Sequence, residues 1–416
     1  MSALDSTDVL RPGPTGFGKW IAARVTAAIP WGFGLLRRFQ PILRLGSLYV
    51  VTLHDDVREV YRTDHAFRVP YKDNLDVITG GEPFFLGMAD TPQYHAQLDA
   101  MRRVARPEDL PMLAARAESM AEAIVEASNG AVEVVGLVRR VTFDLLADYF
   151  GVPEPAVGRL DVWATRLFEY QFTGSPKDKD LRAQVDVIAR AFRAHIDAEI
   201  ARRKTALASA DSGGRDDIIA RCLARQAAGE PGYADVEIRT AVLCMIVGGP
   251  PQPPMVVPQA MEQLLRRPTA LAAARAAAAA NDDARLHDIV LEAMRFDPLA
   301  PALPRHATQA WTVAAGTSRQ QTIPSGATVL VGFASAMMDD RRLPTPTVFD
   351  PGRRPYEYIH FGCGLHECFG RHINHAILHR MLKPLFTRPG LRRAKGPDGR
   401  LTKNGIFAER LVVALG

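Results

Sequence analysis

The feature that most constrains this chain of 416 residues is the segment Phe361–Gly370, which reads FGCGLHECFG. Its three glycines allow backbone conformations that other residues avoid, and they let the backbone approach another group closely. A thiolate in such a loop can accept hydrogen bonds from backbone N–H groups, and these bonds tune the metal that the sulfur binds. The segment therefore predicts a loop that presents Cys368 to a metal.

Three interpretations of this loop compete. Zinc is one, because Cys363, His366, Cys368 and His372 are clustered, but Cys363 and Cys368 are five residues apart and no second cysteine pair matches them. Structural zinc sites commonly use two closely spaced pairs. A turn with incidental cysteines is the second interpretation. The third is a thiolate ligand of heme iron, which pushes electron density onto the metal and favours O–O cleavage. We favour the heme.

The segment resembles the cytochrome P450 signature F-x-x-G-x-x-x-C-x-G, with Phe361, Gly364, Cys368 and Gly370 at its fixed positions. The resemblance implies that Cys368 is the axial ligand of heme b (iron protoporphyrin IX) and that Gly362 also lies against the cofactor. It further implies a mainly α fold with small β-sheets, in which residues 1–416 form a single heme domain.

The family also carries E-x-x-R on a helix upstream of the cysteine. Here Glu292 and Arg295 match this motif, 76 residues before Cys368. Residues three apart share one face of a helix, and a buried pair of charges requires further partners. The resemblance implies a third member of the network, Arg353, with Arg354 as its competitor.

Heme propionates are anionic and favour Arg or His partners. The resemblance nominates Arg305, His366 and His95. The family's H-x-x-x-R element begins at His95, but Asp99 stands where its arginine belongs. The nearest arginines are Arg102 and Arg103, and either is a candidate for a propionate.

The central helix of the family normally carries an acid and an alcohol that relay protons during oxygen cleavage. The corresponding stretch here places Gly248 and Gly249 at the glycine pair, Pro251 at the acid and Gln252 at the alcohol. A small slip in this alignment changes nothing, because residues 241–260 contain no Asp, Glu, Ser or Thr. Four prolines between residues 250 and 254 also predict a kink or break in the helix.

Without the relay, three classes of function remain open. The first is a heme-thiolate enzyme that uses a peroxide or a substrate hydroperoxide, with Gln252 hydrogen-bonding the peroxide and Gly248 and Gly249 beside it. The second is a conventional monooxygenase that receives electrons from ferredoxin and ferredoxin reductase. The third is a heme-binding or substrate-holding module without turnover. Turnover with a hydroperoxide alone, turnover coupled to NAD(P)H, or neither discriminates among them.

Composition restricts the partners and the compartment. A net charge of +5 without a run of basic residues gives little support to nucleic-acid binding, and four scattered cysteines favour a reducing compartment. The apolar stretch Trp20–Leu36 is interrupted by Arg24 and two glycines, so we expect no transmembrane anchor. An amphipathic helix on a membrane surface is the alternative. We expect a cytoplasmic monomer that acts on a hydrophobic small molecule.

Local patterns predict elements along the chain. We expect a strand over Leu48–Leu53, a helix over Asp56–Thr63, and an almost wholly helical region from Met112 to about Arg203, broken at residues 129–130, 151–153 and 174–176. Short strands at Trp311–Ala314 and Thr328–Val331 precede a helix from Arg371, and residues 208–215 form a polar loop. Aromatic candidates for contact with the substrate are Phe84, Phe85, Phe168, Tyr170 and Phe172.

Overall fold

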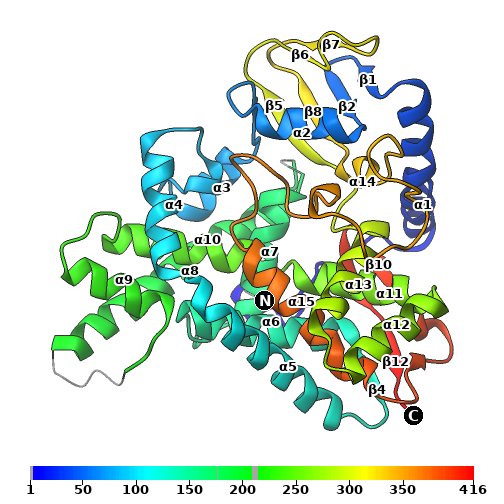
Figure 1. Cartoon of the computed structure of the whole chain (residues 1–416). Coiled ribbons are helices and arrows are strands. Elements are labelled where there is room, and N and C mark those ends of the chain that lie inside the picture. The colour runs from blue at the N-terminus through cyan, green and yellow to red at the C-terminus, as the bar shows by residue number, and fades with distance from the viewer. Residues whose placement is uncertain (1–2, 176, 209–213) are drawn as a thin grey trace. The chain divides into compact units, whose positions relative to one another are not determined.

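The computed structural model describes residues 3–175, 177–208 and 214–416, and the chain divides into two compact units. Helices dominate both units, as expected from the sequence, and small sheets accompany them in unit 2 (Figure 1). Unit 1 comprises Met1–Arg11, Tyr71–Ala117 and Arg139–Pro253, and unit 2 comprises Pro12–Pro70, Glu118–Val138 and Pro254–Gly416.

Unit 1 is built almost entirely from helices. Its long helix α8 places Leu181, Val185, Ile188, Phe192 and Ile196 at intervals of three or four residues, and all five are fully buried. This spacing gives one apolar stripe, against which α7 and α10 pack. The helices of the unit are α3 (Lys72–Thr79), α4 (Pro92–Val104), α7 (Leu160–Phe172), α8 (Lys179–Ala208), α9 (Ile218–Ala227) and α10 (Asp235–Gly248), and α5 (Leu110–Glu126) and α6 (Val134–Phe150) run from one unit into the other.

Unit 2 contains a five-stranded sheet of order β1-β2-β8-β5-β3. Only β2 and β8 pair in parallel, with Tyr49 opposite Val329 and Val51 opposite Val331, and these four side chains are buried in the core of the sheet. Helix α2 (His54–Arg62) packs against this core. The strands are β1 (Ile42–Leu45), β2 (Leu48–Val51), β3 (Phe67–Arg68), β5 (Leu303–Ala307) and β8 (Thr328–Val331).

Three smaller sheets and the remaining helices complete unit 2. The smaller sheets are β4 (Ala131–Glu133), β12 (Val412–Ala414) and β9 (Arg392–Arg393); β6 (Trp311–Val313) with β7 (Gln321–Ile323); and β10 (Thr402–Asn404) with β11 (Phe407–Arg410). The helices are α1 (Gly16–Phe39), α11 (Pro253–Leu265), α12 (Pro268–Ala279), α13 (Asp283–Phe296), α14 (Phe333–Ala336) and α15 (Arg371–Phe386).

Two local expectations are corrected. The break at residues 129–130 is followed by strand β4, which pairs with β12 at the far end of the chain, so local pattern alone gave no sign of it. The predicted strand over Leu48–Leu53 ends at Val51, and the next helix begins at His54, whose backbone N–H donates to Asp339 at 3.0 Å. Of the predicted polar loop, residues 209–213 lie outside the described residues.

The predicted break in the central helix is confirmed. Helix α10 ends at Gly248 and α11 begins at Pro253, with Pro250 and Pro251 in the turn between them. By length and composition the stretch Asp235–Leu265 could cross a membrane, but 78% of its most apolar window is buried, as in the core helix of a globular protein.

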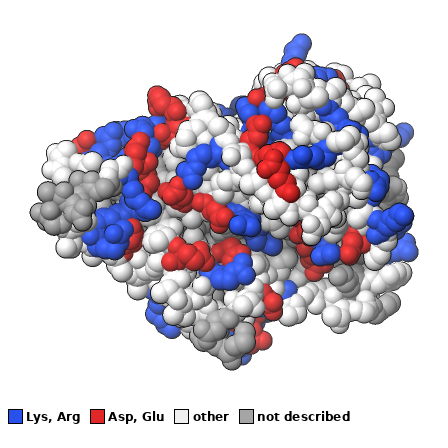
Figure 2. Space-filling model, turned by 90° about the horizontal axis from the view of Figure 1, so that it is seen from below, with Lys and Arg blue, Asp and Glu red and all other residues white. Residues whose placement is uncertain are grey.

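Basic and acidic side chains are interspersed over the face that Figure 2 shows.

Candidate functional site

The cysteine loop in unit 2 is shaped by backbone hydrogen bonds. The N–H of Cys368 donates to the carbonyl of Phe361 at 2.9 Å, and the N–H of Glu367 donates to that of Gly364 at 3.1 Å. The loop leads directly into α15, whose N-cap is Gly370. These contacts hold Cys368 at the entrance of a helix, in the loop predicted from the sequence.

Gly364 is needed for two independent reasons. Its φ of +83° lies in the left-handed region, and a Cβ atom there would lie 2.6 Å from the carbonyl oxygen of Tyr61. At position 364 the loop lies so close to the end of α2 that only glycine, which has no Cβ atom, fits there. Gly362 also has a positive φ, of +70°, but a Cβ on it would meet nothing closer than 3.9 Å.

These two glycines make a matched pair for mutation. We expect Gly364→Ala to lower the free energy of unfolding by about 1–3 kcal/mol, because it adds a steric clash to the backbone strain. We expect Gly362→Ala to cost less, since it adds the strain alone. Urea unfolding and the heme bound per mole of purified protein measure both effects. Equal losses in the two variants would show that the contact with Tyr61 is unimportant.

The Cys368 thiol suits a metal cation. Burial raises its pKa to about 11, although the backbone N–H of Gly370 hydrogen-bonds the sulfur and opposes this shift. A thiol with such a pKa stays protonated near neutral pH unless a cation at the sulfur stabilises the thiolate. Heme iron would supply such a cation, and the N–H of Gly370 is a donor of the kind that tunes a bound thiolate. The surroundings of Cys368 therefore fit heme iron.

Unit 2 also contains a buried ion-pair network. Arg295 and Glu292, both on α13, form two parallel hydrogen bonds of 2.8 and 2.7 Å, and both side chains are fully buried. The Nε of Arg353 lies 3.3 Å from Glu292 Oε1, and Tyr358 donates to the other carboxylate oxygen at 3.1 Å. Burial, followed by the nearby charge of Glu292, raises the pKa of Tyr358. Arg354, the competing candidate, is exposed.

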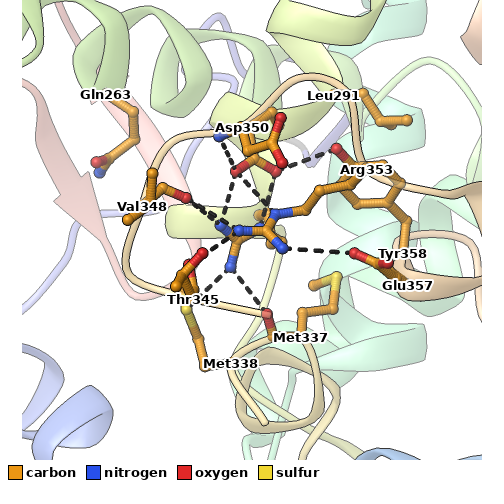
Figure 3. Close-up of polar contacts among 12 residues, drawn as sticks. Gln263, Leu291, Met337, Met338, Thr345, Val348, Asp350, Arg353, Glu357 and Tyr358 are labelled. Carbon is orange, nitrogen blue, oxygen red and sulfur yellow. Dashed lines mark hydrogen bonds and ion pairs between the residues drawn. The ribbon is translucent and has the colours of Figure 1, made fainter. Parts of the chain in front are cut away.

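The arginines of the network also tie down the segment that leads to the cysteine loop. Figure 3 shows Arg353 among backbone carbonyl groups, and its guanidinium donates to those of Thr345 and Val348 at 3.0 and 3.1 Å. Arg295 donates to the carbonyls of Met337 and Val348 at 2.9 and 3.2 Å. The network thus joins α13 to a loop rather than to another helix.

Arg305, on strand β5, is the strongest propionate candidate. Its side chain is only 7% exposed, stacks on the ring of Tyr61 at 4.7 Å, and donates to the carbonyl of Pro304 at 3.0 Å. Among the described residues no carboxylate forms an ion pair with it, although a guanidinium has five N–H donors. A buried cation with unused donors fits an anionic group such as a propionate. Because Tyr61 also contacts Gly364, Arg305 and the cysteine loop share one neighbour.

His366 lies in the same unit with a carboxylate partner. Its Nε2 is 2.8 Å from Asp64 Oδ1, and both side chains are largely buried. Sequence reasoning missed both Tyr61 and Asp64, which stand about 300 residues before the loop they contact. No local motif marks either residue.

The candidates on α4 belong to unit 1. His95 is exposed and its Nε2 lies 2.6 Å from Asp90 Oδ1. Both arginines are exposed, but Arg103 donates to the hydroxyl of Tyr233 at 3.3 Å, whereas Arg102 forms only a loose pair with Asp99 at 3.7 Å. Of the two arginines, Arg103 is therefore the better anchored.

The helix break in unit 1 holds Gln252 close to the glycine pair. The backbone N–H of Gln252 donates to Gly249 at 3.2 Å, and its side-chain amide donates to the carbonyl of Gly248. Gln252 is half-buried. An amide can donate and accept hydrogen bonds, but it does not titrate near neutral pH, so it cannot replace a carboxylic acid as a proton source.

Unit 1 also contains a cavity of about 350 Å³. Phe84 and Phe85, two of the predicted contact residues, line it together with Met101 and Thr240, whose hydroxyl is buried without a partner. Glu82, Gln93, Gln97 and Glu237 also line the cavity, so its size suits a small molecule and its wall is partly polar. Of the candidates on α7, Phe168 packs on Phe172 at 4.8 Å and Phe172 packs on Tyr71 at 5.2 Å. Tyr170 instead contacts Arg182, whose guanidinium donates to its hydroxyl at 3.2 Å.

Among the described residues no group of three or more His, Cys, Asp or Glu is arranged to hold a metal ion. The zinc interpretation of Cys363, His366, Cys368 and His372 therefore gains no support. A heme ligand needs only the one thiolate of Cys368 from the protein.

Comparisons with known proteins identify the family of the chain. Residues 174–388, just over half of the chain, match the family model described as Cytochrome P450. The chain is 24% identical over 352 residues to erythromycin C-12 hydroxylase of Saccharopolyspora erythraea. This match covers 83% of each of the two proteins. It resembles the ligand-free structure of cytochrome P450 TbtJ1 with a TM-score of 0.77 and 22% identity, over 94% of this chain and 98% of that one.

A fungal relative matches over a shorter stretch. The chain is 39% identical over 85 residues to the bifunctional dioxygenase-epoxy alcohol synthase of Pyricularia oryzae, which is 20% of this chain but only 7% of that much longer protein. The family match, the fold and the geometry of the cysteine loop lead to one conclusion: the chain belongs to the cytochrome P450 family.

Proposed function

We propose that this heme-thiolate oxidoreductase acts on the O–O bond of an apolar hydroperoxide, instead of activating dioxygen with two delivered electrons. The observation that carries the proposal is the broken helix at residues 249–252. There an amide, Gln252, stands where the family has an alcohol, and residues 241–260 contain no acid or hydroxyl side chain.

The chemistry of a hydroperoxide suits this set of residues. When a hydroperoxide is isomerised, its O–O bond breaks and both oxygens stay in the product, so neither electrons nor external protons are consumed. Loss of water from the same substrate also needs no electron donor. The relay that the chain lacks is therefore not required.

The protein's own residues take distinct roles in the proposal. A bound heme with a thiolate ligand favours O–O cleavage. Cys368 ligates its iron, Arg305 neutralises one propionate, and His95, His366 and Arg103 are the further candidates for the propionates. The Gln252 amide, which donates to Gly248 in the absence of substrate, turns to hydrogen-bond the peroxide oxygens. We further propose that both compact units act as a single heme domain.

Gln252→Ala tests the role of the amide. We expect kcat for hydroperoxide turnover to fall by roughly tenfold to a hundredfold, because one hydrogen-bond donor to the reacting oxygens is lost. The Soret spectrum should stay unchanged, and Gln321→Ala, which removes an amide from strand β7, should keep full activity. Chromatography of the products from a defined lipid hydroperoxide, without any electron donor, measures the rate. Unchanged kcat in Gln252→Ala would remove the amide from the mechanism.

The second candidate function is a conventional monooxygenase. It is favoured by the match over most of the chain to a protein whose name records a hydroxylation. Under this alternative, turnover requires NAD(P)H, ferredoxin and ferredoxin reductase, and the product carries one new oxygen from dioxygen. If the purified protein fails with hydroperoxides and turns over only with the reduced redox chain, the hydroperoxide proposal is wrong.

A further inference from the structure

Helix α1 exposes a large apolar face. Among the side chains of this helix that the structure describes, six large apolar ones are exposed, and Trp31 and Phe39 are 71% and 73% exposed. Single exposed apolar residues are normal on proteins. A contiguous group of them marks a surface that a partner protein or a membrane covers. The six are Trp20, Ile21, Val25, Trp31, Leu35 and Phe39.

The exposed face is distinct from the face that packs on the protein. On a helix of 3.6 residues per turn, Trp20, Trp31 and Leu35 lie within roughly 60° of one another. The opposite side carries Arg37, whose guanidinium donates to the hydroxyl of Ser335 on α14 at 2.9 Å, and Phe33, which lies beside Gly332. The C-terminal half of α1 is therefore docked through one face and apolar on the other, whereas the described residues from Gly16 to Ala28 are exposed all round.

The charges of α1 are all of one sign. Residues Gly16–Phe39 include no Asp or Glu. Arg24 stacks on the ring of Trp20 at 5.2 Å, and Arg38 stacks on that of Phe39 at 5.4 Å. Both arginines fall within the exposed face by helical spacing. Apolar, tryptophan-bearing helices with basic residues and no acid are suited to the interface of an anionic bilayer.

We propose that α1 docks the protein on an anionic membrane surface, with the helix lying in the plane of the headgroups. Trp20, Trp31 and Leu35 enter the boundary of the acyl chains, while Arg24 and Arg38 reach the lipid phosphates. Because the inner face of α1 is packed on α14, the helix lies on the bilayer and does not cross it.

A second copy of the chain fits the same face less well. In a symmetric dimer through α1, each helix would face its own copy, so Arg24 and Arg38 of both would be brought together. The helix has no carboxylate to pair with them. Lipid phosphates supply the missing negative charge.

Flotation of the full-length holoprotein with vesicles tests the proposal. We expect binding to vesicles of phosphatidylglycerol and phosphatidylcholine, weaker binding to phosphatidylcholine alone, and release by high salt. Trp20→Ser together with Trp31→Ser should weaken binding to the anionic vesicles by at least about tenfold, through lost apolar burial. Arg24→Gln and Arg38→Gln should each weaken it about fivefold, and only on anionic vesicles.

Controls separate membrane docking from other effects. Val157→Ser and Tyr356→Ser remove exposed apolar groups elsewhere and should leave vesicle binding unchanged. All variants should keep the Soret spectrum of the parent, which shows that they fold. No binding to anionic vesicles, or binding that the α1 variants do not change, overturns the proposal. So does a dimer in analytical ultracentrifugation that the tryptophan substitutions dissociate.

Discussion

Replacing Cys368 by Ala abolishes the strongly red-shifted Soret band of the dithionite-reduced, carbon monoxide-bound protein, and turnover with hydroperoxide falls to background. We expect this result because the loop brings one thiol, held by Gly370 and by its own backbone N–H, to the start of α15. The same loop holds one further cysteine, Cys363, five residues earlier.

Cys363→Ala is the matched control. Cys363 packs at the edge of the hydrophobic core of unit 2, and burial raises the pKa of its thiol. The variant should keep the red-shifted band and the activity. If Cys363→Ala lost the band and Cys368→Ala kept it, the axial ligand would have been assigned to the wrong cysteine.

Replacing Glu292 by Gln lowers the free energy of unfolding by about 3–5 kcal/mol, the usual cost of removing one partner from a buried ion pair. The substitution keeps the size of the side chain but leaves Arg295 without its carboxylate partner and Arg353 with Glu357 alone, at 3.4 Å. Tyr358 also loses its charged acceptor. We expect less bound heme in addition, because the loop tied down by Arg353 leads to the cysteine.

Urea unfolding followed by circular dichroism measures this loss, with Asp398→Asn as the control. Asp398 pairs with Arg410 on the surface, where both side chains are about half exposed, so its removal should have no measurable effect. A Glu292→Gln protein as stable as the parent would mean that the network stabilises a particular loop conformation without adding to the stability of the fold.

The parts of the site that could be predicted are those with local signals. The glycines around Cys368, the spacing of Glu292 and Arg295, and the proline-rich break all act through neighbouring residues. Their physical causes are backbone freedom, helical periodicity and the missing N–H of proline, which are properties of the sequence itself. The helix at Arg371 and the strand at Thr328–Val331 began where the pattern predicted.

The parts that escaped prediction depend on contacts between distant segments. Tyr61 supports Arg305 and limits position 364 to glycine, and Asp64 pairs with His366, yet both stand at the end of an ordinary amphipathic helix. The division of the chain into two compact units likewise leaves no local trace, since α5 and α6 run through it without a break. Periodicity identifies elements but does not say which of them meet.

The small sheet of β4, β12 and β9 governs when unit 2 can finish folding. Val412–Ala414 is the last strand of the chain, and it pairs with Ala131–Glu133, about 280 residues earlier. Strand β4 cannot close this edge until β12, which lies far along the chain, has been synthesised. We therefore expect refolding to be slow, because the two strands are so distant in the sequence.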